Sequence, residues 1–330
     1  MKIAYIIYSA SLASGKFNGV RSQAETWAAL LRRTGHCVDL INNWGDYDWS
    51  TYDAIHFFGG CYDLVADLFT LNNKLYWSPI VDPPLDFNYT TFDFLRKIRR
   101  WSGGRLYGKL MMEESAKYIK KIFVRSEFEM EHLMRTLHLP YEKFALVPLS
   151  VSSCCHAYTP IPKEQFCLHI SSIYQSRKNV IRLIEASKKY NFKLVLAGNK
   201  GNESQYRPIK DAIGNSQNID VLGIVSEEQK IDLYKKAKVF CLPSLMEGVG
   251  IVALDAAFYG CEIAITNIPG PKEYYFGNCV EFNPNSVDSI GQSVVALMSN
   301  RIQYQPQLSN AIKEQFSGDN IAKKIIISYN

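Results

Sequence analysis

Residues 243–257 read Pro243-Ser244-Leu245-Met246-Glu247-Gly248-Val249-Gly250-Ile251-Val252-Ala253-Leu254-Asp255-Ala256-Ala257. The apolar run just before them, residues 238–242, predicts a buried parallel strand that ends at Pro243. Gly248 and Gly250 permit a tight turn and a close approach to a ligand, and the composition from Ile251 onward is typical of a helix. The stretch therefore predicts a strand, a glycine loop and a helix N-terminus in direct succession.

This junction is typical of an anion-binding site. A helix N-terminus exposes N–H groups and about half a positive charge, so it can bind phosphate without a metal ion. Glu247 and Asp255 bracket the junction, and ionised carboxylates accept hydrogen bonds from the hydroxyl groups of a hexose or a ribose. An ordinary strand-loop-helix joint that binds no ligand has the same spacing, so the pattern alone leaves both interpretations open.

The segment resembles the E-x7-E signature of glycosyltransferase family 4, whose members are retaining enzymes with the GT-B fold. Asp255 stands where the family has its second Glu. The order of strands and helices from about residue 166 to residue 285 is also similar. Within it, Lys178 and Arg177 lie in a stretch that resembles the family's loop for the donor diphosphate, although the usual Gly-Arg of that loop is Ser171-Ser172 here.

The resemblance implies a nucleoside-diphosphate sugar as donor, no cofactor and no metal. It implies catalytic roles for Glu247, Lys178 and Arg177, with Glu247 orienting the sugar and the two cations stabilising the leaving diphosphate. The family's donor-binding positions fall on a further set of residues: Gly19, Gly198, Gly248, Val249, Gly250, Ile251 and Asp255.

The first half of the chain resembles the family more weakly and offers three candidates for sugar or acceptor contacts. Depending on the alignment, the family's active-site histidine falls on His56 or on Phe58. Asp82 follows residues 78–81, which we expect to be a strand, and matches the acidic position of the next cleft loop. Arg125 follows another predicted strand. The alternatives are a core histidine at His56 and a plain turn residue at Asp82 before Pro83.

The chain of 330 residues is long enough for two domains. Short apolar runs alternate with amphipathic helical stretches, which predicts α/β architecture with parallel sheets. With the resemblance, we expect the GT-B fold, in which two Rossmann-like doubly wound domains face each other across a cleft. We place an acceptor-binding domain at 1–157 and a nucleotide-sugar domain at 158–330, and we expect a closing helix at about 311–329 to pack back on the first domain.

The composition indicates a cytoplasmic protein. Its eight cysteines show no metal-ligand spacing, and no apolar run approaches the roughly 20 residues that cross a bilayer. The apolar start of the chain is short and predicts a first strand rather than a signal peptide. Residues 96–112 contain six cations and no acids among several large apolar side chains. This run suits an anionic membrane surface on the cytoplasmic side, or else a solvated helix face; a nucleic-acid groove fits less well.

We therefore expect a metal-independent, retaining hexosyltransferase that transfers a sugar to a glycan or lipid-linked acceptor in surface polysaccharide assembly. A GT-B nucleotide-sugar epimerase and a non-catalytic nucleotide-sugar-binding pseudoenzyme remain as alternatives; Ser172 and Phe58 replace useful family residues and favour the second. A dehydrogenase is excluded because residues 9–20 lack G-x-G-x-x-G. The letters Asp46-Tyr47-Asp48 match the metal-binding element of GT-A enzymes, but their polar surroundings predict a surface turn.

Overall fold

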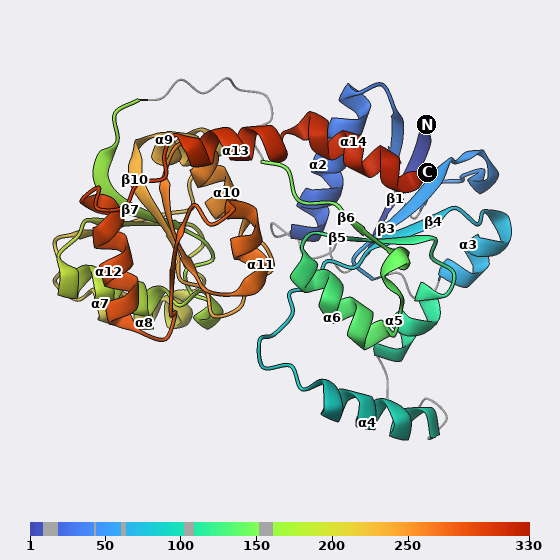
Figure 1. The fold of residues 1–330 in the computed structure, drawn as a ribbon, viewed down its shortest axis with the longest axis horizontal. Coiled ribbons are helices and arrows are strands. Elements are labelled where there is room, and N and C mark those ends of the chain that lie inside the picture. The colour runs from blue at the N-terminus through green and yellow to red at the C-terminus, as the bar shows by residue number, and fades with distance from the viewer. Residues whose placement is uncertain (9–18, 43, 61–63, 102–108, 152–160) are drawn as a thin grey trace. The chain divides into compact units, whose positions relative to one another are not determined.

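The computed structural model describes residues 1–8, 19–42, 44–60, 64–101, 109–151 and 161–330. The chain forms two compact units: unit 1 contains Met1–Ser150 and Gly318–Asn330, and unit 2 contains Val151–Ser317 (Figure 1). The domain boundary expected after residue 157 lies outside the described residues.

Unit 1 is built on a parallel six-stranded sheet with the strand order β2-β1-β3-β4-β5-β6. The strands are β1 (Lys2–Ile7), β2 (Cys37–Leu40), β3 (Ala54–Phe58), β4 (Leu75–Ser78), β5 (Lys121–Val124) and β6 (Phe144–Leu146). The helices are α2 (Gly19–Arg33), α3 (Val65–Leu71), α4 (Tyr89–Trp101), α5 (Lys109–Ala116), α6 (Glu127–Leu137) and α14 (Gly318–Tyr329), with short 3₁₀ turns at Trp49–Thr51 and Tyr141–Lys143.

Unit 2 repeats this architecture with the strand order β12-β11-β10-β7-β8-β9, again all parallel. Its strands are β7 (Glu164–Ile170), β8 (Leu194–Ala197), β9 (Ile219–Gly223), β10 (Ala237–Leu242), β11 (Glu262–Thr266) and β12 (Val280–Phe282). Its helices are α7 (Val180–Tyr190), α8 (Glu203–Ile213), α9 (Glu227–Lys236), α10 (Ile251–Phe258), α11 (Pro269–Lys272), α12 (Val287–Met298) and α13 (Gln307–Gln315), with 3₁₀ turns at Ser176–Lys178 and Glu273–Tyr275.

The central strands are buried along their whole length because helices cover both faces of each sheet. All residues of β3, β4, β8 and β11 are buried. The core of unit 1 gathers around Phe57, Trp77 and Ile122, and the core of unit 2 gathers around Leu183, Leu194 and Val239. The predicted fold class of two Rossmann-like parallel-sheet domains is confirmed.

The end of the chain differs from the single closing helix expected at 311–329. It forms two helices, because α13 ends at Gln315 in unit 2 and α14 begins at Gly318 in unit 1. Figure 1 shows α14 beside α2, and Arg33 of α2 forms an ion pair with Asp319 of α14 at 2.6 Å. No helix in the described part of the chain has the length and apolar character needed to span a bilayer.

Helix α14 is joined to the sheet of unit 1 through His56, in the middle of β3. The ring nitrogens of His56 lie 2.8 Å from the hydroxyl oxygens of Tyr329 and Ser78. His56 has no exposed surface, and burial lowers its pKa from 6.5 to about 3. His56 is therefore a neutral core residue that connects two strands with the last helix.

We predict that acid destabilises unit 1 through His56. Between pH 6.5 and about 3 the unfolded chain binds a proton that the folded unit excludes, so the free energy of unfolding falls as the pH falls, by at most about 1.4 kcal/mol per pH unit. Urea unfolding followed between pH 7 and pH 5 should give a shallower pH slope for His56→Asn than for the wild type.

His138 provides the control, because 40% of its side chain is exposed at the surface. His138→Asn should keep the wild-type slope. Equal slopes for His56→Asn and the wild type would contradict a neutral, buried His56.

Candidate functional site

The carboxyl ends of β7 and β10 lie next to each other in unit 2 and mark the place where the strand order reverses. The chain passes from β7 to β8 on one side and later returns to β10 on the other side of β7. Ligands of open parallel sheets bind outside the carboxyl ends of the strands at such a point. The candidate site is therefore formed by the loop after β7 and the loop after β10, which carry the predicted residues Lys178 and Glu247.

Backbone and side-chain hydrogen bonds join these two loops. The N–H of Leu245 donates to the carbonyl of Arg177 at 2.8 Å. Asn179, in the left-handed conformation at the start of α7, donates through Nδ2 to the carbonyls of Pro243 at 2.9 Å and of Pro284 at 2.7 Å. The loops consequently hold a defined position relative to each other.

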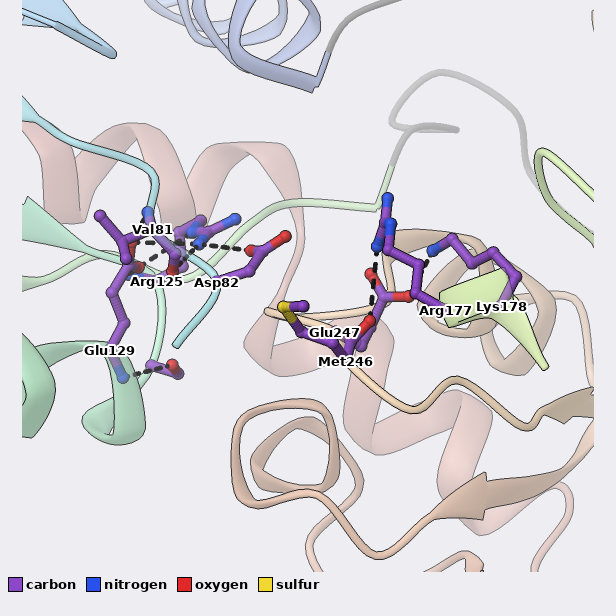
Figure 2. Close-up of polar contacts among 9 residues, drawn as sticks. Val81, Asp82, Arg125, Glu129, Arg177, Lys178, Met246 and Glu247 are labelled. Atoms are coloured by element: carbon purple, nitrogen blue, oxygen red, sulfur yellow. Dashed lines mark hydrogen bonds and ion pairs between the residues drawn. The ribbon is translucent and has the colours of Figure 1, made fainter. Parts of the chain in front are cut away.

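An ion pair between Lys178 and Glu247 connects the same loops (Figure 2). Nζ of Lys178 lies 2.5 Å from Oε2 of Glu247, and each side chain is 12% exposed. Ser244 also donates from Oγ to the same carboxylate oxygen at 3.0 Å. The structure thus brings together two of the three predicted catalytic residues, with opposite charges at the edge of the sheet.

Arg177 lies beside this pair but bonds elsewhere. Its Nε donates to Oε1 of Gln175 at 3.1 Å. Its Nη1 donates to the carbonyl of Met246 at 3.4 Å (Figure 2). Arg177 also lines a surface depression of about 480 Å³ with Tyr174, Gln175, Ser176 and Gln205. The guanidinium therefore stays at the surface of the loop, next to the Lys178–Glu247 pair.

Helix α10 begins directly after this pair. Its N-cap is Gly250, in the left-handed conformation with φ of 73°. A Cβ atom there would stand 2.5 Å from Cδ2 of Leu242, so both the backbone conformation and the packing require glycine. In the described part of the chain, the N–H groups of residues 248–251 donate to no other residue. These amides lie at the positive end of the helix without a partner among the described residues, and residues 248–250 are buried.

Gly198 directly follows β8 and packs against the loop after β7. Its φ is 116°, and a Cβ atom would lie 1.9 Å from the carbonyl oxygen of Ser171.

His169 of β7 is buried, with Nδ1 2.9 Å from the carbonyl of Cys241 and Nε2 2.7 Å from Oγ of Ser171. Since a carbonyl only accepts, Nδ1 carries the proton and the Ser171 hydroxyl donates to Nε2. Burial lowers the pKa of His169 to about 4, so the ring stays neutral.

Asp255, the expected ribose contact, is buried in the structure. It lies on the second turn of α10 and is only 3% exposed. Burial raises the pKa of the Tyr234 and Tyr275 phenols, and the nearby charge of Asp255 raises both further. The shorter aspartate side chain thus lies below the surface of the loop, and the structure does not bring it to the exposed edge with Glu247.

Two further candidates in unit 1 lie in different surroundings, because His56 is buried and Gly19 is exposed. His56 and Phe58, the two positions for the family's histidine, are both 0% exposed, so the expectation that His56 contacts sugar or acceptor is corrected to a role in the core. Gly19 is the first residue of α2, and a Cβ atom there would meet nothing within 4 Å; its backbone does not require glycine for packing.

Asp82 and Arg125 lie together, but not as expected. Strand β4 ends at Ser78, so residues 79–82 form a loop and not the strand expected at 78–81. Arg125 is 8% exposed and donates from Nη2 to Oδ1 of Asp82 at 3.1 Å (Figure 2). Asp82 keeps 38% of its side chain exposed. Of the two, only Asp82 presents its charged group to the surface.

Sequence reasoning missed four residues that hydrogen-bond to these loops or lie within them: Ser244, Asn179, His169 and Glu129. Asn179 carries one usable signal, since asparagine is enriched in the left-handed conformation that precedes α7. Glu129 carries another, because Ser126 and Glu129 match the spacing of a capping box, and the Ser126 hydroxyl does accept the N–H of Glu129. In the described residues, no group of three or more His, Cys, Asp or Glu side chains could hold a metal ion.

We predict that Gly250→Ala destabilises unit 2 by more than a matched glycine substitution. Both Gly250 (φ 73°) and Gly277 (φ 76°) are left-handed, so alanine strains the backbone equally. Only at Gly250 does the new methyl group also meet Leu242; an added Cβ at Gly277 meets nothing within 4 Å. Urea unfolding should show about 1–3 kcal/mol more destabilisation for Gly250→Ala. Equal losses would contradict the close packing at the N-cap.

Comparison with known proteins identifies this part of the chain. Residues 156–315 match the family model described as Glycosyl transferases group 1. An uncharacterized glycosyltransferase of Methanocaldococcus jannaschii is 31% identical over 162 residues, 46% of this chain and 42% of the relative. The O-antigen chain mannosyltransferase B of Escherichia coli is 24% identical over 243 residues, 68% of this chain and 64% of the relative. The chain thus spans less than two thirds of the length of these relatives.

Solved structures with the same fold cover the whole chain. Sucrose-phosphate synthase from Thermosynechococcus elongatus matches with a TM-score of 0.72 at 12% identity, covering 100% of this chain and 98% of its own. HepE from Anabaena, in complex with UDP, matches with a TM-score of 0.72 at 14% identity and 99% coverage of both chains. Residues 156–315 are thus similar to the group 1 glycosyl transferases, and the chain has the GT-B fold.

Proposed function

We propose that the chain is a retaining hexosyltransferase that moves a sugar from a nucleoside diphosphate to a hydroxyl group of a glycan or a lipid-linked saccharide. The observation that carries this proposal is the Lys178–Glu247 pair, 2.5 Å apart, directly before the free amides at the start of α10. A nucleotide sugar presents anionic phosphates next to hydroxyl groups. The ammonium and the amides suit the phosphates, and the carboxylate suits the hydroxyls.

The comparisons support the class of donor and acceptor. One relative is named as an O-antigen chain mannosyltransferase, and solved structures of the same fold include a lipopolysaccharide outer core galactosyltransferase and HepE in complex with UDP-glucose. By extension, we propose a nucleoside-diphosphate hexose as donor and assembly of a surface polysaccharide as the process.

The proposed roles follow from the contacts in unit 2. The Lys178 ammonium has three N–H donors, and the Glu247 carboxylate has about four lone-pair positions. Each can keep the ion pair and still bind a ligand group. Lys178, the neighbouring Arg177 and the amides of residues 248–251 then stabilise the charge that develops on the leaving diphosphate. Glu247 accepts hydrogen bonds from sugar hydroxyls. No metal ion takes part in this proposal.

In the proposed step, the bond from the anomeric carbon to the diphosphate oxygen breaks, and its electron pair leaves with the diphosphate. The acceptor hydroxyl oxygen forms the new bond to the same carbon, on the face that the diphosphate leaves. The proton of that hydroxyl passes to the departing phosphate oxygen. This step needs no protein base, and it retains the configuration of the donor sugar.

We predict that Lys178→Ala lowers kcat by about 10²- to 10³-fold, since it removes one preorganised donor to the leaving group. The control is Lys189→Ala, because Lys189 forms a more exposed ion pair in the same unit, with Asp288; the two side chains are 58% and 51% exposed. Steady-state kinetics of nucleoside diphosphate release should show normal rates for Lys189→Ala. If Lys178→Ala turns over as fast as Lys189→Ala, Lys178 does not contribute to catalysis.

The stereochemistry of the product tests the reaction itself. The chain is incubated with UDP-glucose or GDP-mannose and an alkyl glycoside acceptor in the presence of EDTA, and the anomeric proton of the product is observed by NMR. A new glycoside with the donor's configuration supports the proposal. An inverted product rules out same-face attack, and an altered nucleotide sugar without transfer favours an epimerase.

We also propose that unit 1 attaches to the cytoplasmic face of an anionic membrane through α4. Among the described side chains of this helix, three large apolar ones are exposed, Phe94 at 63%, Leu95 at 55% and Ile98 at 38%. Lys97 is exposed among them. Arg96, within the basic run expected to bind lipid, instead pairs with Glu113, and residues 102–108 of that run lie outside the described residues. Apolar side chains bordered by basic ones suit an interfacial helix.

We predict that the double variant Phe94→Ser/Ile98→Ser binds vesicles of phosphatidylglycerol and phosphatidylcholine at least about tenfold more weakly. The estimate counts only part of the roughly 1.5–3 kcal/mol gained on burying each side chain. Vesicle co-sedimentation measures the loss. The control is Ile327→Ser on α14, a residue that is 71% exposed. If both variants bind like the wild type, α4 is not the membrane contact.

A further inference from the structure

The loop between β4 and α4 contains a strained residue. Ile80 has φ of 56°, a left-handed conformation that is a genuine outlier for a β-branched residue. Such a conformation costs free energy and persists only when the surroundings impose it. Strain of this kind gathers at positions where a group has to be held in place, so the contacts around Ile80 indicate what the loop is holding.

Glu129 and Arg125 impose this conformation by binding both backbone groups of the next residue. The N–H of Val81 donates to Oε1 of Glu129 at 2.6 Å, and the carbonyl of Val81 accepts from Nη2 of Arg125 at 2.7 Å. Arg125 is 8% exposed and Glu129 is 1% exposed. The backbone of Val81 is therefore fixed from both sides by a buried ion pair.

The Glu129 carboxylate has no capacity left for a ligand. Its Oε1 accepts from Val81 and from Nη2 of Arg125 at 3.0 Å, and its Oε2 accepts from Nε of Arg125 at 2.9 Å and from the backbone N–H of Arg125 at 2.8 Å. These four bonds use all of its roughly four lone-pair positions. Glu129 acts on its neighbours only.

Asp82 is the side chain that this loop exposes at the surface. Nη2 of Arg125 holds Oδ1 of Asp82 at 3.1 Å (Figure 2), and no described residue donates to Oδ2. Pro83, the next residue, restricts the backbone of Asp82 to extended conformations. The loop follows the carboxyl end of β4, the edge of a parallel sheet where ligands bind.

Stability does not explain this cluster. A buried ion pair often stabilises a fold no better than apolar side chains of equal volume, and the strain at Ile80 opposes folding. We propose that Arg125 and Glu129 are positioning residues that hold Asp82 as the acceptor of a hydrogen bond from a sugar hydroxyl group. The inference rests on the proposed function, because the hydroxyl belongs either to the donor sugar or to the acceptor glycan.

A double-mutant cycle tests the proposal on the full chain with the variants Glu129→Gln, Asp82→Asn and their combination. The readouts are hydrogen exchange of the Val81 amide, hydrolysis of UDP-glucose and GDP-mannose without acceptor, and transfer to octyl glucoside and octyl mannoside. Glu129→Gln should speed exchange of this amide at least about tenfold and slow turnover at least about tenfold. In the Asp82→Asn background, it should slow turnover no further, because its effect passes through Asp82.

The control is Glu113→Gln, which breaks the comparably buried pair with Arg96 in the same unit, where the side chains are 11% and 13% exposed. This variant should leave Val81 exchange unchanged, and any loss of turnover should add to that of Asp82→Asn. The two assays also separate the ligands. Slower hydrolysis assigns the hydroxyl to the donor sugar, and slower transfer with normal hydrolysis assigns it to the acceptor.

Three results would overturn the proposal. Unchanged Val81 exchange in Glu129→Gln would refute the positioning, whatever the activity. Additive losses in the double variant would mean that Glu129 does not act through Asp82, and full activity of Asp82→Asn would remove Asp82 from the site. A wild-type chain that turns over no donor refutes the proposed function and the ligand role of Asp82, while the exchange result still decides whether Glu129 fixes the loop.

Discussion

The contact between the loops after β7 and β10 is the constraint on which the candidate site depends. Lys178 and Glu247 approach to 2.5 Å, and each keeps 12% of its side chain exposed. Largely buried charges contribute to stability only when further hydrogen bonds satisfy them, and Ser244 supplies one to Glu247. The pair lies where the strand order of the sheet reverses, at the carboxyl ends of β7 and β10. The ion pair that joins the two loops therefore also places a positive and a negative charge where a nucleotide sugar would bind.

Each unit has an ion pair near the carboxyl edge of its sheet. In unit 2 the pair joins two loops and stays accessible, and in unit 1 the Arg125–Glu129 pair is buried and fixes the loop that presents Asp82. A neutral histidine supports each edge from within: His169 binds Ser171 after β7, and His56 binds Ser78 at the end of β4. Burial keeps both rings uncharged, so they connect elements without adding charge to the site.

Most of the fold could be predicted from the sequence, because its strands are short apolar runs between helical stretches. The strand-loop-helix stretch at 238–258 was predicted for physical reasons that the structure confirms: β10 ends at Leu242, and Gly250 is left-handed before α10. The break between α13 and α14 was missed, because residues 311–329 keep helical composition through it. Likewise, residues 78–81 have strand-like composition, and nothing in it reveals the left-handed Ile80.

The site was only partly predictable, because the type and spacing of residues in the sequence do not show which side chains are buried. Glu247 and Lys178 are in contact, as two residues with one ligand should be, yet sequence alone could not show that Asp255 lies 3% exposed or that both nitrogens of His56 are bound in the core. Glu129 was missed because its partners, Val81 and Arg125, meet only when β4 and β5 are paired in the sheet.

The most direct test of a nucleotide-sugar site at Lys178 and Glu247 is calorimetric titration of the chain with UDP, GDP, UDP-glucose and GDP-mannose in the presence of EDTA, in the wild type and in Glu247→Gln. The account predicts that one nucleotide binds the wild type without metal, and that Glu247→Gln weakens the binding of its sugar form by about 5- to 150-fold, or roughly 1–3 kcal/mol, while the free nucleotide binds as before. Binding that requires a divalent metal, or equal weakening of both ligands, would contradict it.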